Sequence, residues 1–391
     1  MAIKYALYFH IPFCTHRCAY CDFNTYAGHE ALIPQYVEAL CREIKLVARS
    51  ASERLSAHTI FFGGGTPSLL TPAQFEIILK TIRDSYDLTS DLEISLEANP
   101  GTVSLDALRD LHDLGFNRIS LGVQSANPVE LRQLERIHDY FDVIDAVAWA
   151  RRAGFDNLNL DLIFGLPEQT LHGWQSTVNL ILGLHPEHLS LYALTLEHGT
   201  PFGRWSQHGL LPVPDPDDAA DMYEWAGEVL ETAGFDQYEI SNWAKAGRQC
   251  RHNLQYWRNL PYLGFGAGAH GCAGGLRISN VLRIKTYLER IQPGGLRSNY
   301  TFPLSPATVN QTQISTRVEM QETMLTGLRL TREGVSALDF TARFGVQIQT
   351  VFGSEIDELV ALSLLEWAGP VLRLTKHGRL LGNQVFIRFV D

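Results

Sequence analysis

Short apolar runs alternate with amphipathic segments throughout the first half of the chain. Each apolar run has the length of a buried strand, and the segments between the runs repeat apolar residues at helical spacing. Strands that alternate with helices in this way are typical of a parallel sheet. We therefore predict six parallel strands, at residues 5–9, 58–62, 92–97, 118–123, 157–163 and 188–194.

Helix-starting signals separate these predicted strands. Thr71, which is followed by Pro72, and Ser104 both stand where a helix N-cap is expected. Six strand–helix units are fewer than the eight of a closed barrel, so we predict the α/β class and a partial (β/α)6 barrel with one open side. The predicted helices lie at 34–48, from 71 onward, at 104–114, 128–134 and 140–153, and from 170 onward.

The second half of the chain has a different pattern. A proline-rich connector at 212–217 precedes a predicted helix at 217–233, and residues 238–275 carry many aromatic residues with little periodicity. Three helices and a β-ribbon then resemble a winged-helix module; the helices are predicted at 319–327, 334–344 and 351–365, and the strands at 371–375 and 384–389. We therefore divide the chain into a barrel core at 1–235, a connecting region at 236–310 and a C-terminal winged-helix-like domain at 311–391.

Composition limits the partners of this chain. It has 391 residues and a net charge of −11, which disfavours nucleic acid as a partner even for a winged-helix-like module. We expect no membrane span, because no apolar run is long enough, and no signal peptide at the N-terminus. Three of the six cysteines lie in one loop rather than in a disulfide framework, so we expect a reducing compartment, the cytoplasm.

The three clustered cysteines indicate a metal site. Cys14, Cys18 and Cys21 have the spacing C-x3-C-x2-C, so one loop can direct all three thiolates at one point. Thiolates select zinc, copper(I) or iron–sulfur clusters. A structural zinc site would need a fourth ligand, for which His10 and His16 are candidates. A cubane cluster with three cysteine ligands keeps one iron open, which is typical of a site that performs a reaction.

Glycine and polar residues stand at the C-terminal ends of the predicted strands, where α/β barrels place their sites. The glycines after the second strand allow the backbone to approach a ligand closely. Each of these residues alone is also explained as a turn, a cap or a core residue, but together they form a ring. The candidates for lining a cofactor site are Tyr8, Tyr20, Gly64, Gly65, Thr66, Glu97, Gln124, Arg136 and Asp161.

The cysteine loop, with Tyr20 directly before its last cysteine, resembles the signature of the radical S-adenosylmethionine (radical SAM) superfamily. The resemblance implies that the three cysteines hold a [4Fe-4S] cluster and that S-adenosylmethionine chelates the fourth iron. In that superfamily the cofactors generate a 5′-deoxyadenosyl radical, while the protein orients and shields them. The resemblance also implies that Gly64, Gly65 and Thr66 lie at the methionine amine.

Further motifs resemble the oxygen-independent coproporphyrinogen III oxidase group of that superfamily. The resemblance extends to Leu374-Thr-x-x-Gly378 near the C-terminus, so it covers nearly the whole chain. The other motifs are Tyr8-x-His10-Ile-Pro-Phe-Cys14, Gly63-Gly-Gly-Thr-Pro-Ser68, Glu97-Ala-Asn-Pro100, Gly122-Val-Gln-Ser125 and Asp161-Leu-Ile-x-Gly165-Leu-Pro167.

Two branches of this group differ at a position near the cysteine loop. The dehydrogenase branch carries a fourth cysteine two residues after the third, and an N-terminal arm; here that position is Phe23, and only 13 residues precede Cys14. The branch of HemW heme chaperones lacks that cysteine and carries His-Asn-x-x-Tyr-Trp, which matches residues 252–257 here. The resemblance implies that His252 contacts heme, either as an axial ligand or as part of the lining. His270 is a second, weaker candidate.

The resemblance implies a heme chaperone that binds heme, a [4Fe-4S] cluster and S-adenosylmethionine, and passes heme to respiratory heme proteins. It also implies a cluster-dependent homodimer, and it assigns no catalytic residue. Two alternatives remain open at this point: a coproporphyrinogen III dehydrogenase, and a radical SAM enzyme that acts on another substrate. By default Cys41, Cys250 and Cys272 are interpreted as small buried apolar residues, although Cys250 lies close to His252.

Overall fold

The computed structural model describes residues 3–292 and 300–390 of the chain. These residues form two compact units, each assembled from two separate stretches of sequence. The first unit contains residues 1–226 and 261–312, and the second contains residues 227–260 and 313–391. The division into a core, a connecting region and a C-terminal domain, with boundaries at residues 235 and 310, stays a prediction.

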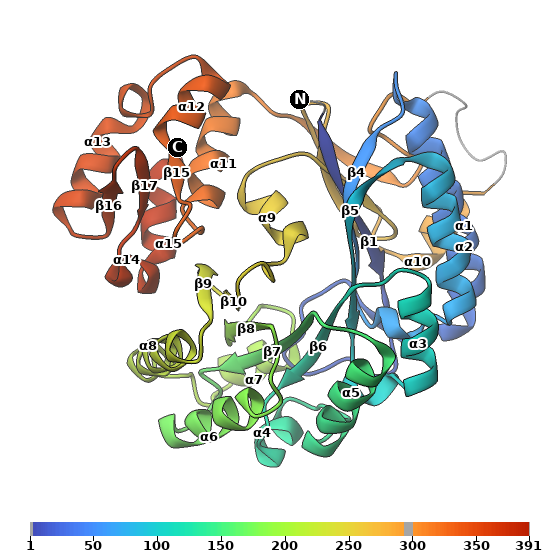
Figure 1. The fold of residues 1–391 in the computed structure, drawn as a ribbon, viewed down its shortest axis with the longest axis horizontal. Coiled ribbons are helices and arrows are strands. Elements are labelled where there is room, and N and C mark those ends of the chain that lie inside the picture. The colour runs from blue at the N-terminus through green and yellow to red at the C-terminus, as the bar shows by residue number, and fades with distance from the viewer. Residues whose placement is uncertain (1–2, 293–299, 391) are drawn as a thin grey trace. The chain divides into compact units, whose positions relative to one another are not determined.

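All six predicted parallel strands are present in the first unit, in the predicted order (Figure 1). Each strand pairs in parallel with the next along the chain, because a helix carries the chain back between them. The strands are β1 (Lys4–Ile11), β4 (Ser56–Gly64), β5 (Asp87–Ala98), β6 (Arg118–Gln124), β7 (Leu158–Phe164) and β8 (His188–Ala193).

The connecting helices follow the predicted starts closely. Thr71 forms a capping box with Gln74, and the Ser104 side chain accepts a hydrogen bond from the N–H of Ala107. α1, α2 and α3 lie side by side along one side of the sheet (Figure 1), and most of their buried residues are apolar. The predicted helices are α1 (Ile33–Ser50), α2 (Pro72–Ser85), α3 (Leu105–Asp113), α4 (Pro128–Gln133), α5 (Tyr140–Ala153) and α6 (Leu171–Leu182). Two further helices of this unit, α7 (Pro201–Gln207) and α10 (Ile284–Arg290), are not among the predicted ones.

The sheet continues beyond β1 in a direction that the sequence pattern does not reveal. β11 (Tyr262–Phe265) lies parallel to β1, and β12 (His270–Ala273) and β13 (Leu276–Asn280) follow as an antiparallel pair, with β14 (Thr308–Gln313) outermost. Residues 238–275, whose sequence shows little periodicity, therefore contain regular strands. These strands are short and rich in glycine because the chains approach closely: a Cβ on Gly264 would lie 1.9 Å from the carbonyl oxygen of His270.

A stack of aromatic rings forms the centre of the core of the first unit. The Phe9 ring lies 5.0 Å from that of Phe62 and 5.1 Å from that of Phe265, which joins three adjacent strands. All three side chains are fully buried. The order of hydrogen-bonded strands has two ends, so the sheet does not close on itself, as expected for a partial barrel.

The second unit contains the predicted C-terminal helices, α11 (Thr316–Gly327), α12 (Ala337–Phe344) and α13 (Ile348–Ala361). Its small sheet has the order β15 (Val335–Ser336), β17 (Val371–Leu374) and β16 (Leu365–Ala368). The strand predicted at 384–389 is wrong, because this stretch forms α15 (Gly382–Phe386) and a 3-10 turn. There Val385 and Phe389, one helical turn apart, are both buried in the same apolar core.

The second unit also contains a short strand pair and two helices, and it shares a further helix with the first unit. β9 (Asp236–Glu239) and β10 (Asn242–Ala244) form an antiparallel pair, and α9 (Arg251–Trp257) carries the His-Asn-x-x-Tyr-Trp motif. α14 (Lys376–Leu380) follows β17, and the predicted helix at 217–233 is α8 (Pro216–Thr232), which runs from the first unit into the second.

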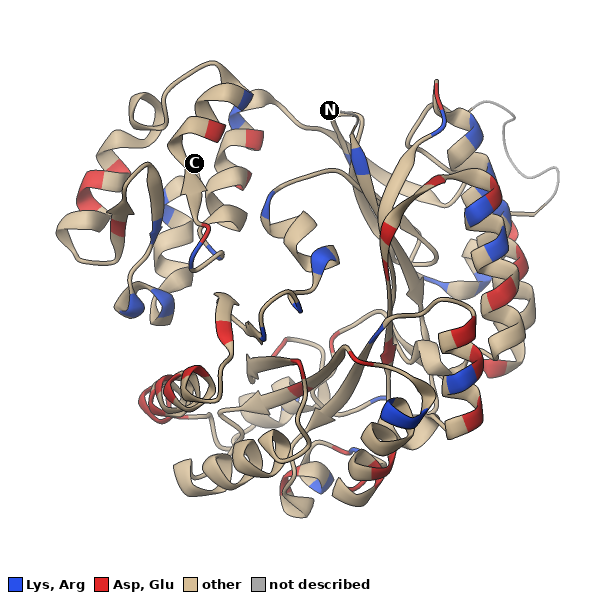
Figure 2. Cartoon of the chain, in the orientation of Figure 1, with Lys and Arg blue, Asp and Glu red and all other residues tan. Residues whose placement is uncertain are grey.

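Acidic residues are concentrated on α8 (Figure 2). Its sequence contains no lysine or arginine, so its exposed surface repels polyanions. The acidic residues are Asp217, Asp218, Asp221, Glu224, Glu228 and Glu231. In the part of the chain that the structure describes, no helix combines the length and the apolar character needed to cross a bilayer.

Candidate functional site

A cavity of about 410 Å³ opens at the C-terminal ends of the parallel strands. It lies within the first unit, where the sequence pattern predicts a site. Most of the predicted site residues line it: Cys14, Cys18, Tyr20, Cys21, Gly64, Gly65, Thr66, Glu97, Gln124, Arg136 and Asp161. Two predicted residues are not in its wall: Tyr8, which belongs to β1, and His252, which belongs to the second unit.

His10 holds the base of the cysteine loop closed. Its Nε2–H donates to the carbonyl oxygen of Asn24 at 3.0 Å, so Nδ1 accepts from the Tyr8 hydroxyl at 3.0 Å. Both ring nitrogens are therefore engaged, and His10 is not the fourth ligand that a zinc site would require. Tyr8 supports the loop through this histidine. The other zinc candidate, His16, is exposed, and its Nε2 lies 3.3 Å from Glu135 Oε2.

The three thiols of the cysteine loop differ in their burial and in the groups that donate hydrogen bonds to them. Burial raises the pKa of Cys14 and that of Cys21. Thr66 Oγ1 donates to Cys14 Sγ at 3.6 Å, and Arg136 Nη1 donates to Cys18 Sγ at 3.5 Å. Arg136 thus brings positive charge to sulfurs that must be deprotonated to bind a metal.

No three His, Cys, Asp or Glu side chains among residues 3–292 and 300–390 converge as the ligands of a single metal ion. A cubane cluster does not require that arrangement, because each cysteine binds a different iron atom. A set of three soft thiolate donors in one wall of a cavity fits such a cluster. It fits a closed zinc site poorly, because four ligands must meet at one ion.

The glycine turn after β4 is attached to the cysteine loop by backbone hydrogen bonds. The N–H of Gly65 donates to Ile11 O at 2.9 Å, and that of Thr66 donates to Phe13 O at 2.8 Å. The N–H of Gly64 donates to Glu97 Oε2 at 3.0 Å. The turn therefore fixes both the start of the cysteine loop and one of the carboxylates of the cavity.

Two carboxylates, Glu97 and Asp161, also line the cavity. Burial, and secondarily the nearby Asp161, raises the pKa of Glu97 from its usual 4.5 to about 7. Burial also raises the pKa of Asp161, which accepts from Ser120 Oγ at 2.8 Å and from Asn159 Nδ2 at 2.8 Å. A positively charged ligand between these groups would offset the cost of ionising Glu97.

A bulge in β6 brings Gln124 and Arg136 to the cavity. The strand register shifts between Gly122 and Gln124, and Gln124 has a φ of 70°. Arg136 Nη2 donates to Gly122 O at 2.7 Å, and His138 Nε2 donates to Val123 O at 3.1 Å. The segment after α4 therefore binds the carbonyls of the bulge.

Sequence reasoning missed several residues of this site. His138 is one of them; burial lowers its pKa to about 4, so it is a neutral donor to the bulge. Its position two residues after Arg136 is the signal that could have identified it. Asn99 and Ser120 also line the cavity, together with exposed Phe23 at the position where the other branch carries cysteine.

The remaining cysteines and His270 lie apart from this wall. Cys41 and Cys250 are buried, as expected, whereas Cys272 is partly exposed; none of the three forms a disulfide among the residues that the structure describes. His270 is exposed on β12.

In the second unit, His252 is paired with a tyrosine of its own helix. The two residues are one turn apart on α9, and the Tyr256 hydroxyl lies 2.8 Å from His252 Nε2. The rings are nearly perpendicular, with centroids 5.0 Å apart. His252 is only 1% exposed, whereas Tyr256 is partly exposed.

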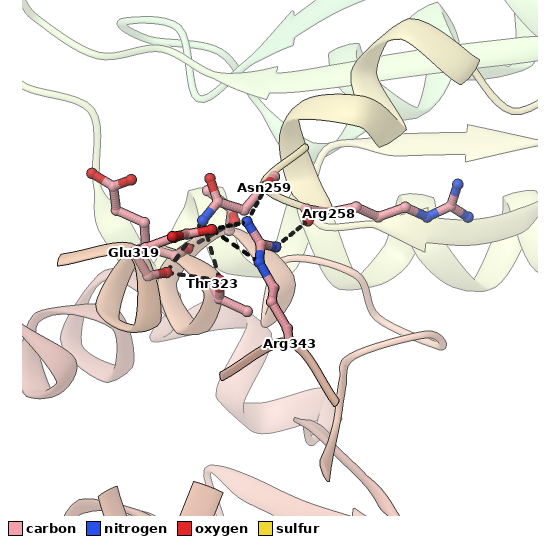
Figure 3. Close-up of polar contacts among 7 residues, drawn as sticks. Arg258, Asn259, Glu319, Thr323 and Arg343 are labelled. Carbon is pink, nitrogen blue, oxygen red and sulfur yellow. Dashed lines mark hydrogen bonds and ion pairs between the residues drawn. The ribbon is translucent and has the colours of Figure 1, made fainter. Parts of the chain in front are cut away.

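The C-terminal end of α9 is tied to the helices that follow it in the same unit (Figure 3). Arg343 of α12 donates to the carbonyl oxygen of Asn259 at 2.8 Å and to Glu319 Oε1 at 2.6 Å. The Asn259 amide donates to Thr323 Oγ1 at 3.1 Å. Arg258 forms a two-pronged pair with Glu333, with both contacts at 2.7 Å. The motif helix and the C-terminal helices thus form one structural body.

The chain resembles known proteins over its whole length. Residues 8–181 match the Radical SAM superfamily, and residues 314–381 match the HemN C-terminal domain family. The chain is 40% identical over 385 residues to the heme chaperone HemW of Bacillus subtilis (strain 168), covering 98% of each protein. It is 36% identical over 386 residues to the heme chaperone HemW of Escherichia coli (strain K12), again covering 98% of each.

The fold resembles that of a solved enzyme. The structure of coproporphyrinogen III oxidase (HemN) from Escherichia coli, a radical SAM enzyme, superposes with a TM-score of 0.82. The match covers 99% of this chain and 90% of that chain, at 24% sequence identity. This likeness shows that both chains share the partial barrel with its helical C-terminal part.

Proposed function

The chain belongs to the HemW family of the radical SAM superfamily, and on that premise we propose that it is a heme chaperone. In this proposal it carries a [4Fe-4S] cluster with S-adenosylmethionine, binds heme, and passes the heme to acceptor heme proteins of respiration. It does so in the cytoplasm, as a homodimer whose formation depends on the cluster. No side chain is assigned a catalytic role.

The proposal is carried by Phe23 together with the motif on α9. Phe23 occupies the position of the fourth cysteine of the dehydrogenase branch; it lines the cavity and is 63% exposed. A phenyl ring there supplies no ligand or reactive group. The motif of residues 252–257 places an imidazole, a phenol and an indole on one short helix, and such rings suit the face of a porphyrin.

The residues that line the cavity of the first unit support a site there for the cluster and its S-adenosylmethionine ligand. Cys14, Cys18 and Cys21 would hold the cluster, and Arg136 would offset its negative charge through Cys18. Glu97 and Asp161 would accept hydrogen bonds from the positively charged methionine end, next to the backbone of the glycine turn. When bound, this pair of cofactors supplies one-electron chemistry that no amino-acid side chain provides.

Glu97→Gln is expected to weaken the binding of S-adenosylmethionine about 10- to 100-fold at pH 8, because a charged hydrogen bond contributes about 1.5–3 kcal/mol. In the wild type, affinity should fall below about pH 7, since Glu97 then takes up a proton that the ligand must displace. The variant should lose that pH dependence. Calorimetric titration of anaerobic protein between pH 6 and pH 8 measures both effects.

Glu97→Gln is expected to weaken ligand binding but not to lower the free energy of unfolding at pH 8. The carboxyl pKa is higher in the folded chain than its usual 4.5, so ionisation costs folding free energy as the pH rises from about 4.5 to about 7. The variant should therefore be at least as stable as the wild type at pH 8. Glu93→Gln, on the same strand but outside the cavity wall, is the control. An unchanged affinity in Glu97→Gln would exclude the carboxylate from the ligand site.

The decisive experiment combines hemin titration with an anaerobic coproporphyrinogen assay on the same preparation. We expect saturable hemin binding and no formation of protoporphyrinogen in the presence of reductant and S-adenosylmethionine. Robust turnover would instead favour the coproporphyrinogen III dehydrogenase, whose fold this chain shares.

His252→Ala is expected to weaken hemin binding at least tenfold, because it removes the imidazole from the motif helix. His270→Ala, which removes an exposed histidine from β12, should bind hemin as the wild type does. Absorbance titration in the Soret region measures both. Equal hemin affinity in the wild type and in His252→Ala would remove His252 from the heme site.

A further inference from the structure

We propose that the glycine-rich segment 266–268 is a second support for the cysteine loop, and that Asn24 is the positioning residue that connects the two. The segment follows β11 in the first unit, and Asn24 stands three residues after Cys21. The inference rests on the proposed function in one respect, namely that Cys21 is a ligand of the cluster. It goes further by assigning a role to residues outside the cavity wall.

The amide group of Asn24 binds two segments that are distant in sequence. Its Nδ2 donates to the carbonyl oxygen of Ala267 at 3.1 Å and to that of Leu282 at 3.0 Å. Because a carbonyl oxygen only accepts, the NH2 group and not the amide oxygen must face these partners. The backbone carbonyl of Asn24 accepts from His10 Nε2 at 3.0 Å. Asn24 therefore ties the residues that leave the cysteine loop both to β1 and to the segment 266–268.

Tyr26 fixes the same end of the loop. Its hydroxyl donates to the carbonyl oxygen of Leu282 at 3.2 Å, and its N–H donates to that of Pro12 at 2.8 Å. Pro12 lies directly before the loop begins, so the loop closes on its own start. The loop is thus closed at its base and held from outside, which limits the positions that Cys21 can adopt.

Two positions of the segment require glycine because the chain approaches them closely. Gly266 has a φ of 98°, and a Cβ there would lie 2.5 Å from the Tyr36 hydroxyl oxygen and 2.6 Å from His10 O. Gly268 has a φ of 81°, and a Cβ there would overlap the amide group of Asn24. These glycines therefore allow the contact with the cysteine loop as well as the turn of the backbone.

A buried carboxylate holds the segment in place. Glu43 of α1 is 1% exposed, and its Oε2 accepts from the N–H of Gly266 and from the Tyr287 hydroxyl, both at 2.8 Å. Its Oε1 accepts from Asn280 Nδ2 at 2.8 Å and from Ser305 Oγ at 2.7 Å. Four donors on one carboxylate offset the cost of burying it. The segment is therefore anchored in the core of the first unit.

The hydroxyl of Tyr36 links the segment to β1. It donates to His10 O at 2.8 Å and accepts from the N–H of Ala267 at 2.8 Å, and Tyr36 is fully buried. Since the carbonyl oxygen of Ala267 accepts from Asn24, the buried network reaches the cysteine loop through this residue. Loss of the Asn24 donor would disconnect the loop from the network without changing the network itself.

The test is the lifetime of the cluster in full-length, anaerobically purified protein. Asn24→Asp keeps the size of the side chain but replaces its NH2 donor with oxygen. We expect a chelator to remove the cluster about tenfold faster than from the wild type, because two hydrogen bonds of the loop are lost. The electron paramagnetic resonance signal of the reduced cluster should also respond less to added S-adenosylmethionine, a change that general destabilisation would not produce.

Asn117→Asp is the matched control. Asn117 Nδ2 donates to the carbonyl oxygen of Leu92 at 2.8 Å in the same unit, and Asn117 does not line the cavity. The variant should lower the free energy of unfolding but keep the wild-type cluster lifetime. A wild-type lifetime in Asn24→Asp, or equal acceleration in Asn117→Asp, would overturn the inference.

Gly268→Ala tests the same contact from the segment. It should shorten the cluster lifetime as Asn24→Ala does, and the double variant should be no worse than Asn24→Ala, because that variant already lacks the amide that the new Cβ displaces. Gly209→Ala is the control for backbone strain, since Gly209 has a φ of 69° but no atom within 4 Å of its Cβ. Additive losses in the double variant would contradict a role through Asn24. Failure of the wild type to hold a cluster would instead refute the proposed function.

Discussion

Cys18→Ser is expected to remove the iron–sulfur cluster almost completely, reducing bound iron from about four atoms per chain to less than about one. Each thiolate binds one iron, and serine is a much poorer ligand for that metal. The sequence around the loop supplies no substitute, because His10 is engaged at both ring nitrogens and His16 is paired with Glu135. Iron and sulfide analysis of anaerobically purified protein measures the loss directly.

Cys272→Ser is the control for this experiment. Cys272 lies in the same unit, on β12, and is also a partly exposed cysteine, but it does not line the cavity. Its substitution should leave iron content unchanged. Retention of four irons in Cys18→Ser, with an unchanged absorption spectrum, would mean that the three cysteines do not share a cluster.

The central strands and the site at their ends could both be predicted from the sequence, because both follow from where each apolar run stops. A strand buried on both faces needs an apolar run, and the polar residue that follows the run necessarily lies at the sheet edge. Gly64, Glu97 and Gln124, which lie at the ends of β4, β5 and β6, show this, since all three residues line one cavity. Metal-ligand spacing is equally local, so the cysteine loop could be identified before any fold was known.

Interactions between distant segments could not be predicted in this way. β11 and β12 are four residues long, and their glycines respond to the close approach of a neighbouring strand rather than to any local period. The pairing of His138 with the bulge carbonyl of Val123 depends on a register shift that leaves no trace in composition.

The motif on α9 shows the limit of sequence reasoning about a site. The pattern identifies His252 as the expected heme contact, because histidine is a common iron ligand. Only the helical geometry shows that the hydroxyl of Tyr256, four residues later, lies within hydrogen-bond distance of His252 Nε2.

The strand wrongly predicted at 384–389 has a related cause. A short apolar stretch fits both the repeat of a strand and that of a helix until its packing partners are known.

Gly65→Ala is expected to lower the iron–sulfur cluster content strongly, although it leaves all metal ligands in place. A Cβ at this position would lie 2.6 Å from Phe13 O and 2.8 Å from Ile11 O. Both are backbone atoms of the segment that enters the cysteine loop, so neither can move aside as a side chain would. The two segments must separate, which weakens the hydrogen bonds from Gly65 to Ile11 and from Thr66 to Phe13.

The cost of this separation is about 2–5 kcal/mol, from two weakened hydrogen bonds and the strain of overpacking. That is a large part of the stability of a typical domain. Because Cys14 directly follows Phe13, its sulfur moves with the strand, and we expect less than about half of the wild-type iron together with weaker binding of S-adenosylmethionine. Iron analysis and thermal unfolding of the anaerobic protein measure the two consequences.

Gly101→Ala separates this effect from the general cost of replacing a glycine. Gly101 also follows a strand of the barrel, but the nearest atom to its Cβ would be 3.8 Å away, on His138. That variant should keep its cluster and its melting temperature. Full iron content in Gly65→Ala would show that the cysteine loop holds its shape without the glycine turn, and the turn would then have no role in placing Cys14.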